Sequence, residues 1–192
     1  MGTNTGFPFQ RIIVVGTTGS GKSTLAEGLA DTLGLELIEL DALNWGQDWT
    51  PAGDELLRAR AENATRSPGW VISGNYSATR AVTWPRAQAV VWLDYPFRVV
   101  FWRLLSRTLR RVWTGERLWA GNRERLGSQL KLWSDDSLIH WLFKTYWRRK
   151  REYPQLFALP EYAHLQIVHL HTPDEAQALL AGLQPLKRSP RS

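Results

Sequence analysis

The sequence predicts an α/β fold in which five buried strands form a parallel sheet with helices on both faces. Short apolar runs rich in β-branched residues alternate along the chain with longer segments of helical periodicity. The runs contain few polar positions, which is typical of strands that are covered on both faces. A glycine-rich turn also joins the first strand to the first helix.

Each element is predicted from its own local pattern. The strands cover residues 11–16, 36–40, 70–73, 88–93 and 165–170. The first helix spans 22–33 and ends at Gly34, and the second spans 51–66, with Thr50 as its N-cap and Pro51 in its first turn. A basic helix begins at Pro96, an apolar helix spans 138–146, and Thr172 caps the last helix. Because ligands of such sheets bind where the strands end, functional residues are expected at the carboxyl edge.

Length and composition favour a single globular domain, residues 1–192, with loose ends at 1–10 and 184–192. The absence of Cys excludes disulfides and thiolate chemistry. Four His residues do not form the HExxH or Cys–His spacings of common zinc sites: His140, His164, His169 and His171. No apolar run approaches the roughly 18 residues needed to span a bilayer, and the start lacks a signal-peptide pattern. We therefore expect a cytoplasmic protein without a membrane partner.

Positive charge is concentrated in one part of the chain. The formal net charge is +6, but residues 98–151 hold 14 Lys and Arg against 4 Asp and Glu, whereas the remainder holds 10 against 14. Such a block has an anionic partner or is a solvated face. The candidate partners are a nucleoside triphosphate and a nucleic acid.

A phosphate-binding motif follows the first predicted strand. Residues 16–23, Gly-Thr-Thr-Gly-Ser-Gly-Lys-Ser, match GxxxxGK[ST] in full, between a buried strand and a helix. Backbone N–H groups of such a P-loop and the helix N-terminus bind phosphate oxygens. Lys22 is predicted to contact the β- and γ-phosphates, and Ser23 to ligate Mg²⁺. The predicted residues for binding ATP with Mg²⁺ are Gly16, Thr17, Thr18, Gly19, Ser20, Gly21, Lys22, Ser23 and Thr24.

Other P-loop classes carry motifs that this sequence lacks. It has no NKxD segment, by which GTPases recognise guanine. Motor ATPases carry Asp-Glu at the end of a strand, whereas here Tyr95 follows Asp94. Asp94 is interpreted as a helix-start residue ahead of Pro96, with a metal-binding or water-activating role as the alternative.

Two carboxylates lie at the end of the second predicted strand. Glu39 and Asp41 are two residues apart, so on an extended strand both side chains point to the same side. At the carboxyl edge they would face the γ-phosphate, where phosphoryl transfer needs one acid for the acceptor and one for Mg²⁺ waters. Asp41 is therefore a predicted catalytic and acceptor-binding residue, and Glu39 a predicted metal ligand. The alternatives are a turn cap for Asp41 and a solvated side chain for Glu39.

Aromatic and polar residues after the second and third strands predict an acceptor pocket. The acceptor-binding segments are about 41–66 and 74–86, and the candidate residues besides Asp41 are Trp45, Asn75, Tyr76 and Arg80. An aromatic wall with these polar groups suits a ring or base that carries a hydroxyl or a phosphate. Because the chain has 11 Trp, ordinary packing is the alternative for Trp45.

The segment of about 114–135 is predicted to be a lid. Its arginines are separated by glycines, which permit hinge motion, and guanidinium groups bind phosphate oxygens in a bidentate way. Arg117 and Arg123 are the predicted catalytic residues of this lid, with solvated side chains as the alternative. The preceding helix offers further candidates: Arg107, Arg110 and Arg111. The basic run at 148–151 is interpreted as a solvated helix end, with a nucleic-acid footprint as the alternative.

Several segments together resemble a known group of proteins. These are GTTGSGKST, ELDALNW, SGNYS and WLDYP followed by an Arg-rich helix. They are similar to segments of the adenylate-kinase-related small-molecule kinases, and more narrowly of the bacterial DNA topology modulation proteins, which are adenylate-kinase-like P-loop proteins. The resemblance covers about residues 11–183. It implies a three-layer P-loop NTPase fold with strand order 2-3-1-4-5 and a helical lid after the fourth strand. Where adenylate kinases have Asp-Gly-Phe-Pro-Arg, this chain has Ser73-Gly74-Asn75-Tyr76, which is more similar to shikimate and gluconate kinases.

The sequence thus predicts an ATP-dependent kinase that transfers the γ-phosphoryl group to a hydroxyl or phosphate of a small molecule or nucleotide. Lys22 and the lid arginines stabilise the transferring charge, Ser23 holds Mg²⁺ and Asp41 orients the acceptor. One alternative is an ATP-binding regulator associated with nucleic acid, and another is a slow P-loop NTPase. The basic block favours the regulator, but its dispersal over two helices and a lid argues against it.

Overall fold

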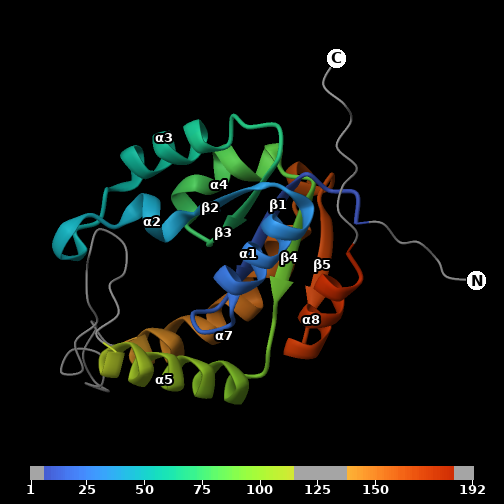
Figure 1. Cartoon of the computed structure of the whole chain (residues 1–192). Coiled ribbons are helices and arrows are strands. Elements are labelled where there is room, and N and C mark those ends of the chain that lie inside the picture. The colour runs from blue at the N-terminus through green and yellow to red at the C-terminus, as the bar shows by residue number, and fades with distance from the viewer. Residues whose placement is uncertain (1–6, 115–137, 184–192) are drawn as a thin grey trace, which may run out of the picture.

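The computed structural model describes residues 7–114 and 138–183, which form a three-layer α/β fold (Figure 1). Its strands are β1 (Arg11–Gly16), β2 (Glu36–Glu39), β3 (Trp70–Ser73), β4 (Ala89–Leu93) and β5 (Gln166–Leu170). They form one parallel sheet in the order β2-β3-β1-β4-β5, which confirms the predicted fold class and strand order. β1 lies between β3 and β4, so the loop that follows it starts in the middle of the carboxyl edge.

Helices cover both faces of the sheet (Figure 1). α1 (Lys22–Leu33) and α8 (Pro173–Ala181) pack on one face, and α3 (Asp54–Ala64) and α4 (Ser77–Thr83) pack on the other. α5 (Phe97–Thr114) and α7 (Leu138–Phe157) pack against each other beyond the carboxyl end of β4. The short elements are α2 (Leu40–Asn44) and the 3₁₀ turns η1 (Gln47–Trp49), η2 (Trp84–Arg86) and η4 (Pro160–Tyr162).

The central strand β1 is buried on both faces, as its unbroken apolar run predicts. Ile12 and Val14 belong to the core beneath α1 and α8, whereas Ile13 and Val15 belong to the core on the opposite face. Each of these side chains is at most 1% exposed. Because neighbouring strands hold β1 from both sides, the start of the glycine-rich loop has a fixed position.

The predicted second strand is one residue too long. β2 ends at Glu39, and Leu40 begins the short helix α2. Glu39 pairs with Ser73, the last residue of β3, so no further partner strand is available to extend β2. Asp41 therefore lies in the first turn of α2 and not on an extended strand. The expectation that Glu39 and Asp41 share one face of a strand was wrong.

The predicted second long helix starts later than expected. α3 begins at Asp54, after Gly53 with a positive φ of 81°, and not at Pro51. Backbone pairing explains the shift, because Pro51 forms an antiparallel bridge with Trp45 and the Ala52 N–H donates to Asn44 at 2.8 Å. These backbone contacts hold the connection between α2 and α3 in a compact conformation. By contrast, the N-cap of α8 is confirmed, since Thr172 Oγ1 accepts a hydrogen bond from the Glu175 N–H at 3.2 Å.

The helix after the predicted lid is twice as long as its apolar stretch suggested. α7 continues from Leu138 through the basic run to Phe157 and tolerates Pro154 near its end. The basic run therefore lies in the middle of a helix and is not a helix end. Within this run only Arg149 is half-buried, whereas Arg148, Lys150 and Arg151 are exposed.

Some predictions fall outside the described residues. The predicted lid at 114–135 lies there apart from Thr114, as do Arg117 and Arg123. The same holds for the ends at 1–6 and 184–192, whereas Phe7 and Phe9 pack against the core. Within 7–114 and 138–183, no helix combines the length and apolarity that crossing a membrane requires.

Candidate active site

The loop between β1 and α1 has the backbone conformation that its glycines predict. Gly19 and Gly21 have φ angles of 79° and 93°, in the left-handed region that favours glycine. A Cβ atom at Gly19 would lie 2.9 Å from both the Val100 carbonyl oxygen and the Leu104 Cβ of α5. The loop is therefore packed closely against α5, and α1 begins directly after Gly21. This is the strand–loop–helix geometry that presents backbone N–H groups to phosphate.

Lys22 lies at the centre of a cluster of charged groups. Its Nζ donates to the Thr17 carbonyl oxygen at 2.9 Å, so the side chain folds back over the loop. The pKa of Lys22 is lowered to about 7, mainly by burial and also by the cations of Arg149 and Arg107, while the Asp41 carboxylate opposes this lowering. An anion placed among Lys22, Arg149 and Arg107 would favour the ammonium form and raise the pKa of Lys22 again. The site is thus electrostatically prepared for phosphate.

The lowered pKa of Lys22 predicts that nucleotide binding takes up a proton. At pH 8 the Lys22 amine is largely neutral in the free protein, because its pKa is about 7. Phosphate oxygens favour the ammonium and raise that pKa, so MgATP binding at pH 8 is expected to take up most of one proton. Calorimetry in buffers of different ionisation enthalpy measures this uptake. At pH 6 the uptake should vanish, and a buffer-independent enthalpy at pH 8 would contradict the prediction.

Ser23, the predicted Mg²⁺ ligand, faces the end of β3. Its Oγ lies 3.3 Å from the Ser73 Oγ, and Ser73 is paired in register with Glu39 at the end of β2. The predicted metal ligands Ser23 and Glu39 therefore lie on either side of one strand end. Hydroxyl and carboxylate oxygens are ligands that suit Mg²⁺, so these residues fit the ion that the motif implies.

Asp41 is held by Tyr76 across the carboxyl edge. The Tyr76 hydroxyl donates to Asp41 Oδ1 at 2.6 Å, and the Asn44 amide donates to the same hydroxyl at 3.4 Å. Burial raises the pKa of Tyr76, and the Asp41 carboxylate raises it further. Tyr76 therefore remains a proton donor at any pH near neutral. The negative charge of Asp41 also favours the ammonium form of Lys22 and so raises its pKa against the effect of burial.

Asn75 connects the end of β3 to α7. With its carbonyl oxygen turned towards α7, the Asn75 amide accepts from Nε and Nη1 of Arg149 at 3.1 and 3.2 Å and from the Tyr153 hydroxyl at 2.8 Å. Arg149 Nη1 also lies 3.5 Å from the carbonyl oxygen of Gly16, the first P-loop residue. Asn75 thus orients an arginine beside the P-loop, a contact that the sequence prediction of direct substrate binding did not include.

Arg149 is a candidate functional residue that the sequence interpretation missed. It belongs to the basic run that was interpreted as solvated, yet burial lowers its pKa. A signal was present, because Leu142, Tyr146 and Tyr153 are buried residues of α7 at helical spacings from Arg149. Arg149 therefore falls on the inner stripe of the helix. Arg103 was also missed, although its Nη1 donates to the Ser20 carbonyl oxygen at 3.4 Å.

The remaining predicted acceptor residues take part in ring contacts. Trp45 is half-buried and packs edge-to-face against Trp49, with ring centroids 5.8 Å apart. The Arg80 guanidinium lies 5.2 Å from the centroid of the Trp84 ring. Arg80 is therefore held on the α4 side, and its positive charge still lowers the pKa of Tyr153 against the larger effect of burial.

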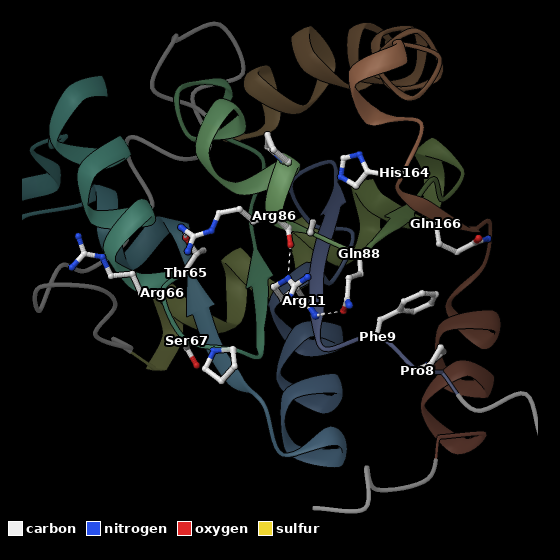
Figure 2. A pocket seen from close by; sticks show the side chains of 13 residues that line it. Pro8, Phe9, Arg11, Thr65, Arg66, Ser67, Arg86, Gln88, His164 and Gln166 are labelled. Carbon is white, nitrogen blue, oxygen red and sulfur yellow. Dashed lines mark hydrogen bonds between the residues drawn. The ribbon is translucent and has the colours of Figure 1, made fainter. Parts of the chain in front are cut away.

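A separate hollow lies at the opposite edge of the sheet. It has a volume of about 760 Å³ and is lined at the amino ends of the strands by residues that include Arg11, Gln88 and Gln166 (Figure 2). The Gln88 side chain accepts hydrogen bonds from the backbone N–H groups of Gln10 and Arg11 at 2.8 and 3.1 Å. None of the individually predicted site residues lines this hollow, although it is lined by the ends of both predicted acceptor-binding segments, at Thr65, Arg66, Pro85 and Arg86.

Comparison with known proteins agrees with this geometry. Residues 12–73, which span the P-loop and the first three strands, match the ATPase family associated with various cellular activities (AAA). The structure is similar to shikimate kinase from Bacteroides thetaiotaomicron, with a TM-score of 0.55, 19% identity, and coverage of 90% of this chain and 95% of that one. The chain has the P-loop NTPase kinase fold.

Two further structures of this fold are similar. A gluconokinase from Sinorhizobium meliloti 1021 has a TM-score of 0.51 and 21% identity, covering 92% of each chain. Shikimate kinase from Acinetobacter baumannii in complex with shikimate has a TM-score of 0.51 and 19% identity, covering 90% of this chain and 92% of that one. No curated protein sequence matches the chain. At these identities the similarity establishes the P-loop kinase fold, and the reaction has to be argued from the site.

Proposed function

We propose that this chain is an ATP-dependent phosphotransferase, which transfers the γ-phosphoryl group of MgATP to a hydroxyl or phosphate oxygen of a small molecule. The observation that carries the proposal is that Lys22 Nζ and Arg149 Nη1 both contact the glycine-rich loop, at the carbonyl oxygens of Thr17 and Gly16. The charges of Arg107 and the Asp41 carboxylate also act on Lys22. Cations and backbone dipoles at that point stabilise the charge on a transferring phosphoryl group. A carboxylate that faces these cations is suited to orient the acceptor and to accept its proton.

In the proposed chemical step, Asp41 and Tyr76 have separate roles. The acceptor oxygen forms a bond to the γ-phosphorus while the bond to the β–γ bridging oxygen breaks, and ADP leaves with that electron pair. Asp41 accepts the proton of the acceptor hydroxyl. Tyr76 supports this role, because its bond to Asp41 Oδ1 fixes the carboxylate and leaves the second oxygen for the acceptor.

Ser23 and Glu39 would hold Mg²⁺ near the loop, with Ser73 beside them. When bound, Mg²⁺ supplies positive charge to the phosphate oxygens. Lys22 and Arg149 orient the triphosphate from the other side. Arg149, which lies beside the P-loop, is proposed to act on the phosphates in addition to the predicted lid arginines Arg117 and Arg123.

The acceptor is proposed to bind between the end of β2 and α4. Trp45, Tyr76 and Arg80 offer an apolar ring surface, a hydroxyl and a cation on that side. The similar proteins of known structure are named for kinases of shikimate and gluconate, both hydroxylated carboxylic acids. Hydroxylated carboxylic acids are therefore the first compounds to test as acceptors, followed by nucleosides and nucleoside monophosphates.

A screen for acceptor-dependent ADP release tests the proposal. One compound class is expected to raise ADP release well above the rate with MgATP alone. A uniformly slow rate with every compound would support a slow NTPase. ATP turnover that requires DNA or RNA, together with a gel shift that weakens with salt, would support the nucleic-acid regulator, for which Arg149 provides little support because it is turned towards the P-loop.

Replacing Arg149 by Gln is expected to lower kcat by about 10², with a smaller change in ATP affinity. The guanidinium acts most strongly on charge that develops during transfer, so its loss affects turnover more than ground-state binding. Arg148→Gln is the matched control, because Arg148 is the preceding residue of α7, is 52% exposed and pairs with Glu152 at 3.5 Å. Equal kcat values in the two variants would remove Arg149 from the proposed machinery.

A further inference from the structure

Three potential metal ligands, none of them assigned to the proposed phosphoryl transfer, meet at the ends of β4 and β5. Asp94 follows β4, His169 lies in β5, and His171 follows β5. One ligand atom from each lies within 4.8 Å of the other two. The grouping depends on strand pairing, since His169 is in register with Trp92 and the Asp94 N–H donates to the Leu170 carbonyl oxygen at 2.9 Å. Sequence spacing alone could not reveal it.

The distance between two of the ligand atoms fits a tetrahedral ion. His169 Nε2 lies 3.2 Å from Asp94 Oδ2, within hydrogen-bonding distance. Two ligand atoms that each bind zinc at about 2.0–2.1 Å in a tetrahedron are separated by roughly 3.3 Å, so both could bind one ion with little movement. The ring of His171 lies 4.0 Å from that of His169 and tilts against it by 46°. A short side-chain adjustment would bring its nitrogen to the third position.

The surroundings hold all three ligand residues in place. The His169 ring stacks on Trp92 with centroids 3.9 Å apart and an interplanar angle of 6°. The Asp94 side chain is only 10% exposed, and its other oxygen, Oδ1, pairs with Lys150 Nζ at 3.2 Å. The His171 backbone N–H donates to Glu175 Oε2 at 2.6 Å, which anchors the third ligand to the start of α8. Such supporting contacts orient ligands for metal binding.

We propose that Asp94, His169 and His171 form a binding site for a divalent transition-metal ion of the zinc type. Two imidazole nitrogens and one carboxylate oxygen suit Zn²⁺ far better than Mg²⁺, and water would complete the tetrahedron. The nearby Lys150 ammonium opposes the ion by charge and occupies the second oxygen of Asp94. The site is therefore of moderate affinity, and binding of the ion weakens the contact of Lys150 with Asp94. This proposal stands independently of the phosphotransferase reaction.

Calorimetric titration of the untagged full-length chain with Zn²⁺ in excess Mg²⁺ tests the proposal. The excess Mg²⁺ occupies the oxygen ligands near the P-loop. One Zn²⁺ per chain is expected, with an affinity reduced by about ten-fold or more in His171→Ala. Lys150→Gln should bind Zn²⁺ more tightly than the wild type, because the competing ammonium is gone.

His164→Ala serves as the control, because His164 is exposed and lies beside the hollow at the opposite edge. It should bind Zn²⁺ like the wild type. If His171→Ala fails to fold by circular dichroism, His169→Gln replaces it, with the same expected loss. No Zn²⁺ binding by the wild type, or equal binding by the wild type and the ligand variants, would overturn the proposal.

Discussion

Replacing Lys22 by Ala is expected to lower kcat/KM for MgATP by a factor of about 10³. Lys22 donates to the Thr17 carbonyl oxygen and is placed to exchange that bond for phosphate oxygens. Its loss removes both the ground-state contact and the stabilisation of transferring charge. Steady-state kinetics measure the loss of the ground-state contact together with the loss of stabilisation of the transferring charge. Direct titration with a non-hydrolysable ATP analogue isolates the loss of affinity.

The same variant should not lower the free energy of unfolding at neutral pH. The pKa of Lys22 falls from 10.5 to about 7 on folding, so the folded protein disfavours its ammonium. The unfolded chain therefore binds more protons between these pH values, and Lys22 makes wild-type stability rise with pH across that window. Lys22→Ala should lack this rise. Lys144→Ala is the control, because Lys144 is an exposed residue of α7. If Lys22→Ala has the same kcat/KM as this control, the P-loop assignment is contradicted.

Replacing Asp41 by Asn is expected to lower kcat by a factor of about 10² to 10⁴, the contribution typical of a general base. Asn has the same shape and still accepts the hydrogen bond of Tyr76, so the acceptor pocket should keep its form. Affinity for ATP should change little, because Asp41 is proposed to act on the acceptor. Single-turnover kinetics at saturating ATP measure the expected loss.

Two companion variants make this result specific. Tyr76→Phe removes the donor that orients Asp41 and should lower kcat by a smaller factor than Asp41→Asn, with an unchanged ATP affinity. Asp48→Asn changes an exposed carboxylate of η1 and should behave as the wild type. If Asp41→Asn retains wild-type turnover, Asp41 is not the base, and the alternative of a turn-capping role would explain its position.

Local patterns predicted the fold well because they carry the physical constraints of a parallel sheet. The run from Arg11 to Gly16 is apolar at nearly every position, which only burial on both faces explains, and the motif that follows requires a strand before it and a helix after it. Errors arose where long-range pairing decides an element's end. β2 stops at Glu39 because β3 stops at Ser73, and nothing near Glu39 in the sequence reveals that limit.

The candidate site could be predicted only where its residues lie close to recognisable strand ends in the sequence. The P-loop and the neighbourhood of Asp41 and Tyr76 follow strand ends, so their sequence positions indicated their place. Arg149 lies more than 130 residues from Gly16, and only the buried stripe of α7 could have separated it from its solvated neighbours. The Asp94–His169 contact depends likewise on the pairing of β4 with β5.

The destination of the γ-phosphoryl group is the most direct test of the account. ATP labelled in its γ-phosphate is incubated with the wild-type chain, Mg²⁺ and the acceptor that raises ADP release, and the products are separated. We expect the label to appear in a phosphorylated acceptor in the same amount as ADP, and Lys22→Ala to abolish this transfer. Label found only as inorganic phosphate, at a rate that no acceptor changes, would contradict it.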